Sequence, residues 1–325
     1  MRLRTHRSVF RRWLIGVAIV PYSFLSLPLP AAIAQADSEG SGFQFKEIDE
    51  KSLGLWEGDR RVLVYRFGEM SLPGVRAAGV RSSYVHPIYG LDGEVLTDDF
   101  PADHYHHHGL FWGWPHVTVG GREYDLWKMR GIRIEFRRWL EQHATAKRAK
   151  LGVENGWFVR SKQVMKEEAW FDVHPATDDG RNIDVTLKWT PTDEPIMLGG
   201  AEGKGYGGLS LRFAPRTATM ITTPDGRASE DLLVAKLPWS DLSGKFAGRS
   251  RPSGTAIFVG PRHPDFPPEW MTREYGLLAV GWPGVKPKTL LPGETVACRY
   301  RLWIHRDTLD AAEIQKVYDA YATVP

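Results

Sequence analysis

The sequence predicts an all-β protein, built as a large antiparallel β-sandwich with one C-terminal helix. Short runs rich in β-branched and aromatic residues recur along the chain, and turn residues separate them. The segment Ile183–Thr190 alternates apolar with polar residues, as an antiparallel strand with one buried face does. Helical segments do not alternate with these runs, which a parallel α/β sheet would require.

Strand character appears from the start of the predicted domain to its end. Turn signals such as Asn155-Gly156 and Asp225-Gly226 lie between the runs. The predicted strands are Val62–Phe67, Tyr84–Tyr89, Val117–Val119, Arg122–Leu126, Gly131–Phe136, Trp157–Val164, Ala169–Val173, Ile183–Thr190, Leu209–Phe213, Thr217–Thr222, Thr255–Val259, Leu277–Gly281 and Thr295–His305.

The clearest helix signal follows Asp310. Asp310 and Glu313 form a capping box, and Leu309 with Ile314 forms a hydrophobic staple. Apolar residues then recur at helical spacing, which predicts a helix that covers one end of the domain. Ser229–Lys236 could form a second, short helix.

The first 36 residues have the composition of a secretory signal peptide. A segment with five arginines precedes an apolar run from Trp13 to about Leu29, and small residues end at Ala36. Prolines interrupt the run, so a permanent membrane span is not expected. The general secretory route is favoured over the twin-arginine route, because Phe10 stands where that signal has Ser or Thr. We therefore expect a periplasmic or secreted protein whose mature part, residues 37–325, forms a single β-sandwich domain.

Charge and cysteine content exclude two classes of function. The chain has 42 Lys and Arg residues against 39 Asp and Glu. Without the five leader arginines, 37 basic residues face 39 acidic ones, a formal net charge of −2. Nucleic-acid binding is therefore not expected. The single cysteine, Cys298, rules out an internal disulfide, and its place on the apolar side of Val296–Ile304 predicts a core residue and not a catalytic thiol.

The densest group of chemically active side chains is Asp103–His108, which reads Asp-His-Tyr-His-His-His. With His86 and His116, this stretch accounts for six of the ten histidines outside the leader. Imidazole exchanges protons near neutral pH and is the commonest metal ligand. Adjacent imidazoles repel one another as cations, so most should be neutral at pH 7, which suits a general base and a ligand equally.

A metal site is one interpretation of this stretch. If Asp103–Gly109 is extended, His104 and His106 point the same way and can share an ion, whereas His108 lies about 13 Å from His104. A further ligand would have to come from elsewhere. The cupin spacing and the His-Glu-x-x-His motif are both missing. The cofactor is therefore either none or a divalent metal ion at His104 and His106, and a solvated His-rich loop is a third interpretation.

Two further features could complete a site. The glycine loop Gly199–Gly208 precedes a predicted strand, so its G-x-G-x-x-G spacing is not a dinucleotide fingerprint, which must open a helix. This loop either lets the backbone approach a ligand or simply connects two elements. Trp112 and Trp114 share one face directly after the histidines, and sugar rings settle on such indole faces. The side chains that the loop presents are Glu202, Lys204 and Tyr206.

Several stretches together form a recognisable set: Arg81–Gly93, Thr97–Gly109, Tyr206–Leu209 and Pro264–Trp270. The set resembles a family of exported bacterial proteins named PmoA-like, or methane oxygenase PmoA-like, over roughly residues 45–322. The resemblance implies a galactose mutarotase-like supersandwich and an association with carbohydrate utilisation. It does not imply methane oxidation, because that oxygenase subunit is a polytopic membrane protein and residues 37–325 contain no predicted span.

Three functions follow from these features. The first is a carbohydrate-active lyase, epimerase or hydrolase, with His104 or His107 as general acid or base, His86 close by, and Glu202 as carboxylate partner. The second is a metal-dependent hydrolase or oxygenase built on His104 and His106. The third is a non-catalytic glycan-binding protein. The expected partner is a carbohydrate or another small molecule. Candidate substrate-binding residues are Arg81, Trp112, Trp114, Lys204 and Tyr206.

Overall fold

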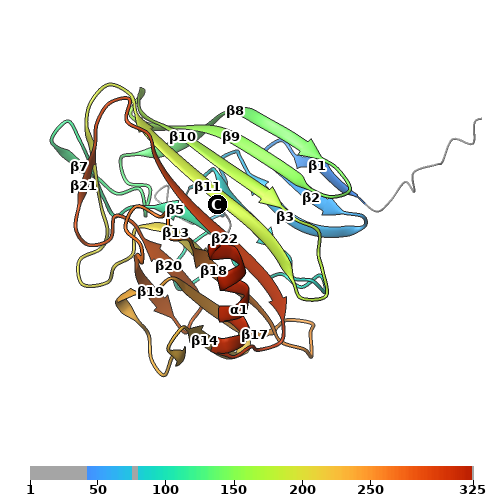
Figure 1. Cartoon of the computed structure of the whole chain (residues 1–325). Helices are drawn as coiled ribbons and strands as arrows, with labels where there is room; N and C mark the ends of the chain where they lie inside the picture. Colours follow the sequence, from blue (N-terminus) through green and yellow to red (C-terminus); the bar gives the residue numbers. More distant parts are fainter. Residues whose placement is uncertain (1–41, 75–79, 324–325) are drawn as a thin grey trace, which may run out of the picture. The chain divides into compact units, whose positions relative to one another are not determined.

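The strands form two nine-stranded sheets and one four-stranded sheet in the computed structural model, which describes residues 42–74 and 80–323 (Figure 1). Every pairing between these strands is antiparallel within the described residues. The predicted all-β antiparallel class is therefore confirmed.

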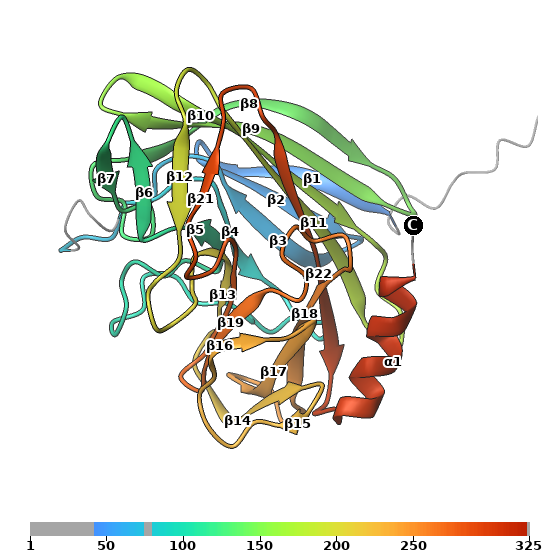
Figure 2. The ribbon, with the colours of Figure 1, turned by 60° about the vertical axis from the view of Figure 1, so that its left-hand side comes forward.

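Strands that are distant in the sequence become neighbours in each sheet. In order across the sheet, the first contains β1 (Phe43–Asp49), β2 (Ser52–Glu57), β3 (Arg60–Arg66), β4 (Tyr84–Ile88), β5 (Leu110–Gly113), β13 (Gly208–Arg212), β20 (Leu277–Gly281), β19 (Glu269–Arg273) and β16 (Leu233–Lys236). The second contains β15 (Gly226–Arg227), β14 (Arg216–Thr223), β17 (Trp239–Phe246), β18 (Ser253–Val259), β22 (Val296–Arg306), β11 (Arg181–Pro191), β10 (Lys162–Val173), β9 (Ala149–Val159) and β8 (Arg133–Ala144). The small sheet contains β21 (Lys288–Leu290), β12 (Ile196–Gly199), β6 (His116–Val119) and β7 (Arg122–Tyr124), side by side in Figure 2.

The main core lies between the two large sheets. Residues alternate between buried and partly exposed along β11, as the sequence pattern predicts. Rings from both sheets meet in this core, where the centroids of Tyr65 on β3 and Trp112 on β5 lie 5.7 and 6.4 Å from that of Phe171 on β10. Cys298 is buried in the same core, as expected.

A carboxylate, Glu167 of β10, is fully buried within this core. The amide of Asn155 donates to one of its oxygens at 2.9 Å. Burial raises the pKa of Glu167, and the hydrogen bonds oppose that shift. The other oxygen accepts the indole N–H groups of Trp112, Trp157 and Trp189 at 2.8, 2.8 and 3.0 Å.

The C-terminal helix α1 (Ala311–Ala322) begins as predicted. Asp310 accepts the backbone N–H of Glu313, and the Glu313 side chain accepts that of Asp310. Ile314 and Tyr318 are buried against Trp239, Phe258 and Trp303, so the helix lies against β17, β18 and β22 (Figures 1 and 2).

Three local predictions are wrong. Ser229–Lys236 is not helical, because Leu233–Lys236 extends to pair with β19 at the edge of the first sheet. Trp157–Val164 is not one strand, because β9 ends at Val159 and β10 begins at Lys162 after a tight turn. Asn155-Gly156 is not a turn, since Asn155 remains in β9 and uses its amide to bond Glu167.

The described residues all belong to one compact unit, Glu39–Pro325. Among them, no helix is long and apolar enough to cross a membrane. The signal peptide predicted for residues 1–36 lies outside the described residues, so the signal peptide and export both stay predictions.

Candidate functional site

A pocket of about 300 Å³ lies on the side of the first sheet that faces away from the main core. That side carries a second, smaller apolar cluster, which includes Phe111 of β5 and Ala279 of β20. The volume is at the lower end of small-molecule sites, which span about 300–1,000 Å³. The side chains that line it, and that define what we call the histidine pocket, are His104, His106, His107, Trp127, Lys128, Lys204, Tyr206, Asp231, Met271, Arg273 and Tyr275.

The histidine stretch that forms one wall of this pocket is turned and not extended. The backbone N–H of His104 donates to Pro101 at 3.0 Å, and that of His107 donates to His104 at 2.9 Å. These turns bring the rings of His104 and His107 into a parallel stack, with centroids 4.7 Å apart and planes 3° from parallel. The extended conformation considered for Asp103–Gly109 is therefore not the one that this stretch adopts.

The end of the turn is fixed by close packing. His108 points away from the pocket and is buried, and its Nδ1 lies 2.7 Å from Asp99. Gly109 has a φ of 45°, and a Cβ there would lie 2.2 Å from the carbonyl oxygen of Val85. Only glycine fits that position without displacing β4, so Gly109 holds the histidine turn against the sheet.

His104 is held between two rings. His107 covers one face, and Tyr275 covers the other with centroids 5.1 Å apart and planes 15° from parallel. His107 in turn contacts Phe111 and Trp127 of the smaller apolar cluster. The His104 side chain nevertheless keeps 38% of its surface exposed, so it is fixed in orientation and still accessible.

Asp103 and Arg212 fix the hydrogen bonding of His104. The Nδ1 atom of His104 lies 3.0 Å from Asp103 Oδ2, and Arg212 Nη2 donates to both Asp103 oxygens at 2.8 and 3.0 Å. Burial works to raise the pKa of Asp103, but the hydrogen bonds from His104 and Arg212 outweigh it and hold the pKa below its usual value. An ionised carboxylate only accepts hydrogen bonds. Nδ1 of His104 must therefore carry the proton, which leaves Nε2 as the nitrogen that can take one.

The other two imidazoles of the pocket stay neutral at pH 7. Burial is the largest cause that lowers the pKa of His106 to about 3, and the nearby Lys128 ammonium lowers it further. Burial also lowers the pKa of His107, with His106 and His104 adding to the shift. Within residues 42–74 and 80–323, no group of three or more His, Cys, Asp or Glu side chains is placed to hold a metal ion. The predicted metal pair His104 and His106 therefore finds no third ligand.

The remaining walls of the pocket supply cations and phenols. Asp231 pairs with Arg273 at 3.1 Å and also accepts the backbone N–H of Glu274. Burial raises the pKa of Tyr206 and of Tyr275, so both phenols keep their protons at neutral pH. The two lysines of the pocket, Lys128 and Lys204, make no ion pair with any described residue.

Two predicted catalytic residues lie outside this pocket. His86 on β4 is bonded through Nδ1 to Thr97 at 3.0 Å, and burial lowers its pKa to about 4. Glu202 is exposed on the β12–β13 loop and does not line the pocket. Glu202 is therefore not among the side chains that line the pocket with His104, and the carboxylate beside His104 is that of Asp103.

Three predicted substrate-binding residues are core residues instead. Trp112 and Trp114 are fully buried, and their indole N–H groups bond Glu167 and the carbonyl of Trp282. Arg81 is 1% exposed and donates to backbone carbonyls of Trp112, Leu126 and Trp127. None of the three can meet a ligand, because all three side chains are buried and donate hydrogen bonds to groups of the protein itself. Lys204 and Tyr206 do line the pocket.

The glycine loop between β12 and β13 is tightly packed. A Cβ on Gly207 would lie 2.8 Å from Gly200, and one on Gly208 would lie 2.7 Å from the carbonyl of Val280. The close approach of backbone therefore occurs between two parts of the protein, whereas the predicted approach is to a ligand. This packing places Lys204 and Tyr206 at the pocket.

Several pocket residues carry no local signal in the sequence. Arg212, which binds Asp103 at the edge of the pocket, does carry a local signal. It is a charged residue inside the apolar strand β13, and a buried arginine requires an acidic partner. Its partner, Asp103, lies 109 positions away, a distance that no local pattern reveals. The pocket residues missed by sequence reasoning are Trp127, Lys128, Asp231, Met271, Arg273 and Tyr275.

Several solved structures match this chain at low identity and with low TM-scores. An α-galactosidase from Lactobacillus brevis has 9% identity and a TM-score of 0.40, and the match covers 84% of this chain and 40% of that protein. A galactose mutarotase related enzyme from Lactobacillus acidophilus has 10% identity, a TM-score of 0.36 and coverage of 81% and 97%. A GalM/aldose epimerase homologue from C. elegans has 9% identity, a TM-score of 0.37 and coverage of 82% and 100%. This chain thus spans less than half of the α-galactosidase.

Sequence comparison places the chain in a family. No curated protein matches it. The predicted assignment to the PmoA-like, or methane oxygenase, family is wrong, because the family that matches is a different one whose function is unknown. The match covers residues 53–319, which is most of the chain. The chain therefore belongs to the family of unknown function DUF6807.

Proposed function

We propose that this protein is a carbohydrate-active enzyme that moves a proton at a sugar carbon, as a lyase or an epimerase does, with His104 as the general base. The observation that carries the proposal is the arrangement of Arg212, Asp103 and His104 at the edge of the histidine pocket. A base oriented by a third group is the arrangement that general-base catalysis requires.

The proposed role of each residue follows from its contacts. Asp103 holds the proton on Nδ1 of His104 and would stabilise the imidazolium that forms when Nε2 takes a proton. His107 and Tyr275 prevent the ring from rotating away. A positioned base of this kind contributes about a hundredfold to ten-thousandfold in rate.

The pocket supports a sugar as the substrate. Tyr275 is 40% exposed at the pocket, while His104 and the Arg212 guanidinium both lie against its ring, so its hydroxyl and ring edge are the parts that a sugar can contact. The tyrosine hydroxyls, lysines and imidazoles offer hydrogen-bonding partners for sugar hydroxyls.

Hydrolysis is less well supported than proton transfer at carbon. Most glycoside hydrolases use two carboxyl groups on either side of the bond to be cleaved. Among the side chains that line the histidine pocket, Asp231 is the single carboxylate, and it is already bonded to Arg273 and Glu274.

Solvent exchange tests the proposal directly. The purified chain is incubated in D₂O with methyl glycosides of neutral and acidic sugars and with oligosaccharides, and deuterium in each carbon position is followed by NMR. We expect exchange at one carbon of one class of sugar. His104→Gln should lower the exchange rate by about a hundredfold or more.

A matched control comes from the opposite sheet. His174 also pairs with an aspartate that is bound by an arginine, so His174→Gln removes a similar histidine without touching the pocket. Full exchange by His104→Gln would refute the assignment. Binding of a sugar without exchange at any carbon would identify a non-catalytic glycan-binding protein instead.

A further inference from the structure

The charges of the histidine pocket do not balance. Two acids at the pocket already have an arginine partner, since Asp103 pairs with Arg212 and Asp231 pairs with Arg273. A third acid, Asp125, accepts the backbone N–H of Lys128 and lies near Tyr206, but its carboxylate forms no ion pair with the Lys128 ammonium. The two lysines, Lys128 and Lys204, have no acidic partner among the described residues. With His106 and His107 uncharged, the two lysine charges remain for whatever occupies the pocket.

The surroundings of Lys128 make this imbalance significant. Lys128 is half-buried, and the hydrogen bond from its backbone N–H to Asp125 at 2.8 Å fixes its place in the turn after β7. Its ammonium is close enough to His106 to lower the pKa of that imidazole. A partly desolvated ammonium without a counter-charge is unfavourable, and an anionic ligand removes that penalty.

Lys204 reaches the same pocket from a separate rigid segment. The β12–β13 loop is closed by hydrogen bonds from Ala201 to Tyr206 at 2.7 Å and from Gly205 to Ala201 at 3.0 Å. Glu202, the acid nearest to Lys204 in the sequence, lies outside the pocket. Two lysines on independently fixed loops can therefore approach one anionic group from two directions.

We propose that the histidine pocket selects a sugar acid, a uronate whose carboxylate is held by Lys128 and Lys204. This inference rests on the function proposed above. A carboxylate suits that function better than a phosphate, because a carboxylate acidifies the C–H bond beside it. The lysines would then hold the same group in which negative charge develops when His104 removes the neighbouring proton.

The step balances without an oxidant or a reductant. Nε2 of His104 takes the C5 proton, and the C5–H electron pair forms a C5=C6 bond while charge moves onto the carboxylate oxygens beside the lysines. In an epimerase, a proton returns to C5 from the opposite face. In a lyase, the pair moves to form C4=C5, the C4–O bond breaks, and the leaving oxygen takes up a proton.

The test compares uronates with sugars of matched shape. Binding of the methyl glycosides of glucuronate, galacturonate and mannuronate is measured by calorimetry beside the methyl esters of the same uronates and the parent neutral sugars. Glucose 6-phosphate serves as the phosphate probe. We expect one uronate to bind about tenfold to a hundredfold more tightly than its ester, because the two differ by one charged interaction. Added salt should reduce that preference.

Variants identify the residues responsible. The double substitution Lys128→Met and Lys204→Met should weaken binding of the uronate much more than binding of its ester, and so remove the preference between them. The matched control is Lys150→Met with Lys188→Met, two lysines of the second sheet that pair with Glu141 and Glu168. That control should keep the preference.

The outcomes separate this inference from the proposed function. Deuterium exchange on a neutral sugar, with no preference for a uronate, would overturn the inference and leave the proposed function intact. Tighter binding of the phosphate probe than of every uronate, or a preference that survives in the lysine double variant, would also overturn it. Lysine-dependent uronate binding without exchange at any carbon would support the inference and refute the proposed function.

Discussion

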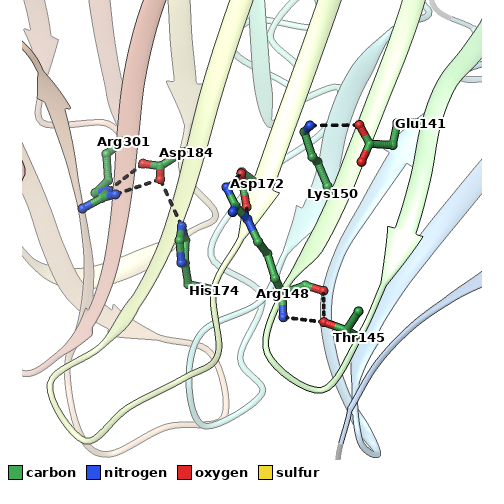
Figure 3. A network of polar contacts seen from close by, with 8 residues as sticks. All are labelled: Glu141, Thr145, Arg148, Lys150, Asp172, His174, Asp184 and Arg301. Atoms are coloured by element: carbon green, nitrogen blue, oxygen red, sulfur yellow. Dashed lines mark hydrogen bonds and ion pairs between the residues drawn. The ribbon is translucent and has the colours of Figure 1, made fainter. Parts of the chain in front are cut away.

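The same three residue types, Arg, Asp and His, meet in two regions of this protein. On the histidine turn, Arg212 bonds Asp103, which bonds His104. On the outer face of the second sheet, Arg301 bonds Asp184 through two contacts of 2.6 and 2.7 Å, and Asp184 lies 3.1 Å from His174 (Figure 3). The two groups have similar hydrogen bonds, so the difference between them must come from their surroundings.

The surroundings differ in the charged and aromatic side chains that line the hollow beside each group. Near Asp184, Arg148 bonds Asp172 and Lys150 bonds Glu141, so that these charges already have partners (Figure 3). A hollow of about 570 Å³ adjoins Asp184 and is larger than the histidine pocket. Around His104, by contrast, two lysines remain without partners among the described residues. Arg299 of the larger hollow also makes no ion pair with a described residue, so unpaired charge alone does not separate the two regions. The histidine pocket differs in combining two such cations with stacked imidazoles.

The largest expected effect comes from removing the aspartate of each group in turn. Asp103→Asn should lower kcat by about a hundredfold to ten-thousandfold with little change in KM, because the asparagine no longer fixes the tautomer of His104. Asp184→Asn should leave both constants unchanged. Steady-state kinetics on the substrate identified by deuterium exchange measures both. Equal losses in the two variants would show that the surroundings do not distinguish the groups.

The sequence predicts the fold better than the site, and particular residues show why. The alternation in Ile183–Thr190 and the capping box at Asp310 are local, and both appear as expected. The burial of Trp112 depends on Glu167, which is 55 positions away. The shape of the histidine turn depends on the contact of Gly109 with β4 and on Arg212. Local patterns therefore identify which residues matter, whereas their orientation is decided by distant partners.

A third His–Asp pair extends the comparison to full burial. His305 lies 2.9 Å from Asp241, and the two side chains are 1% and 0% exposed. Asp241→Asn should lower the free energy of unfolding by about 3–5 kcal/mol, because it leaves a buried charged partner unpaired. Chemical denaturation at constant pH measures this loss. A loss below about 1 kcal/mol, which is typical of an exposed ion pair, would show that burial does not strengthen the His305–Asp241 pair.

The sign of the pH dependence at His305 follows from its surroundings. Burial works to lower the pKa of His305, but Asp241 outweighs it, and the pKa is raised above 6.5. The stabilisation is therefore fully present below about pH 6.5 and is lost as pH rises through the folded-state pKa. Denaturation of the native chain and of Asp241→Asn at pH 5.5 and pH 9 should show the larger difference at pH 5.5.

A smaller effect is expected for the group formed by Arg301, Asp184 and His174 on the second sheet. Arg301→Ala should lower the free energy of unfolding by about 1.5–3 kcal/mol, the value of hydrogen bonds between charged groups. Burial works to raise the pKa of Asp184, but His174 and Arg301 outweigh it and lower the pKa. The stabilisation is thus present above the unfolded-state pKa and is lost as pH falls through the folded-state value. Denaturation between pH 7 and pH 3 should show the native chain and the variant converging in acid.

The smallest effect is expected at the exposed edge of the same network. Arg148 bonds Asp172 with 58% of its side chain exposed, and water and salt screen such a pair. Arg148→Ala should therefore change the free energy of unfolding by less than about 1 kcal/mol, and added salt should shrink the difference further. A loss comparable to that of Arg301→Ala would mean that the network of Figure 3 acts as one cooperative unit, and its paired charges would then carry more stability than their separate exposures indicate.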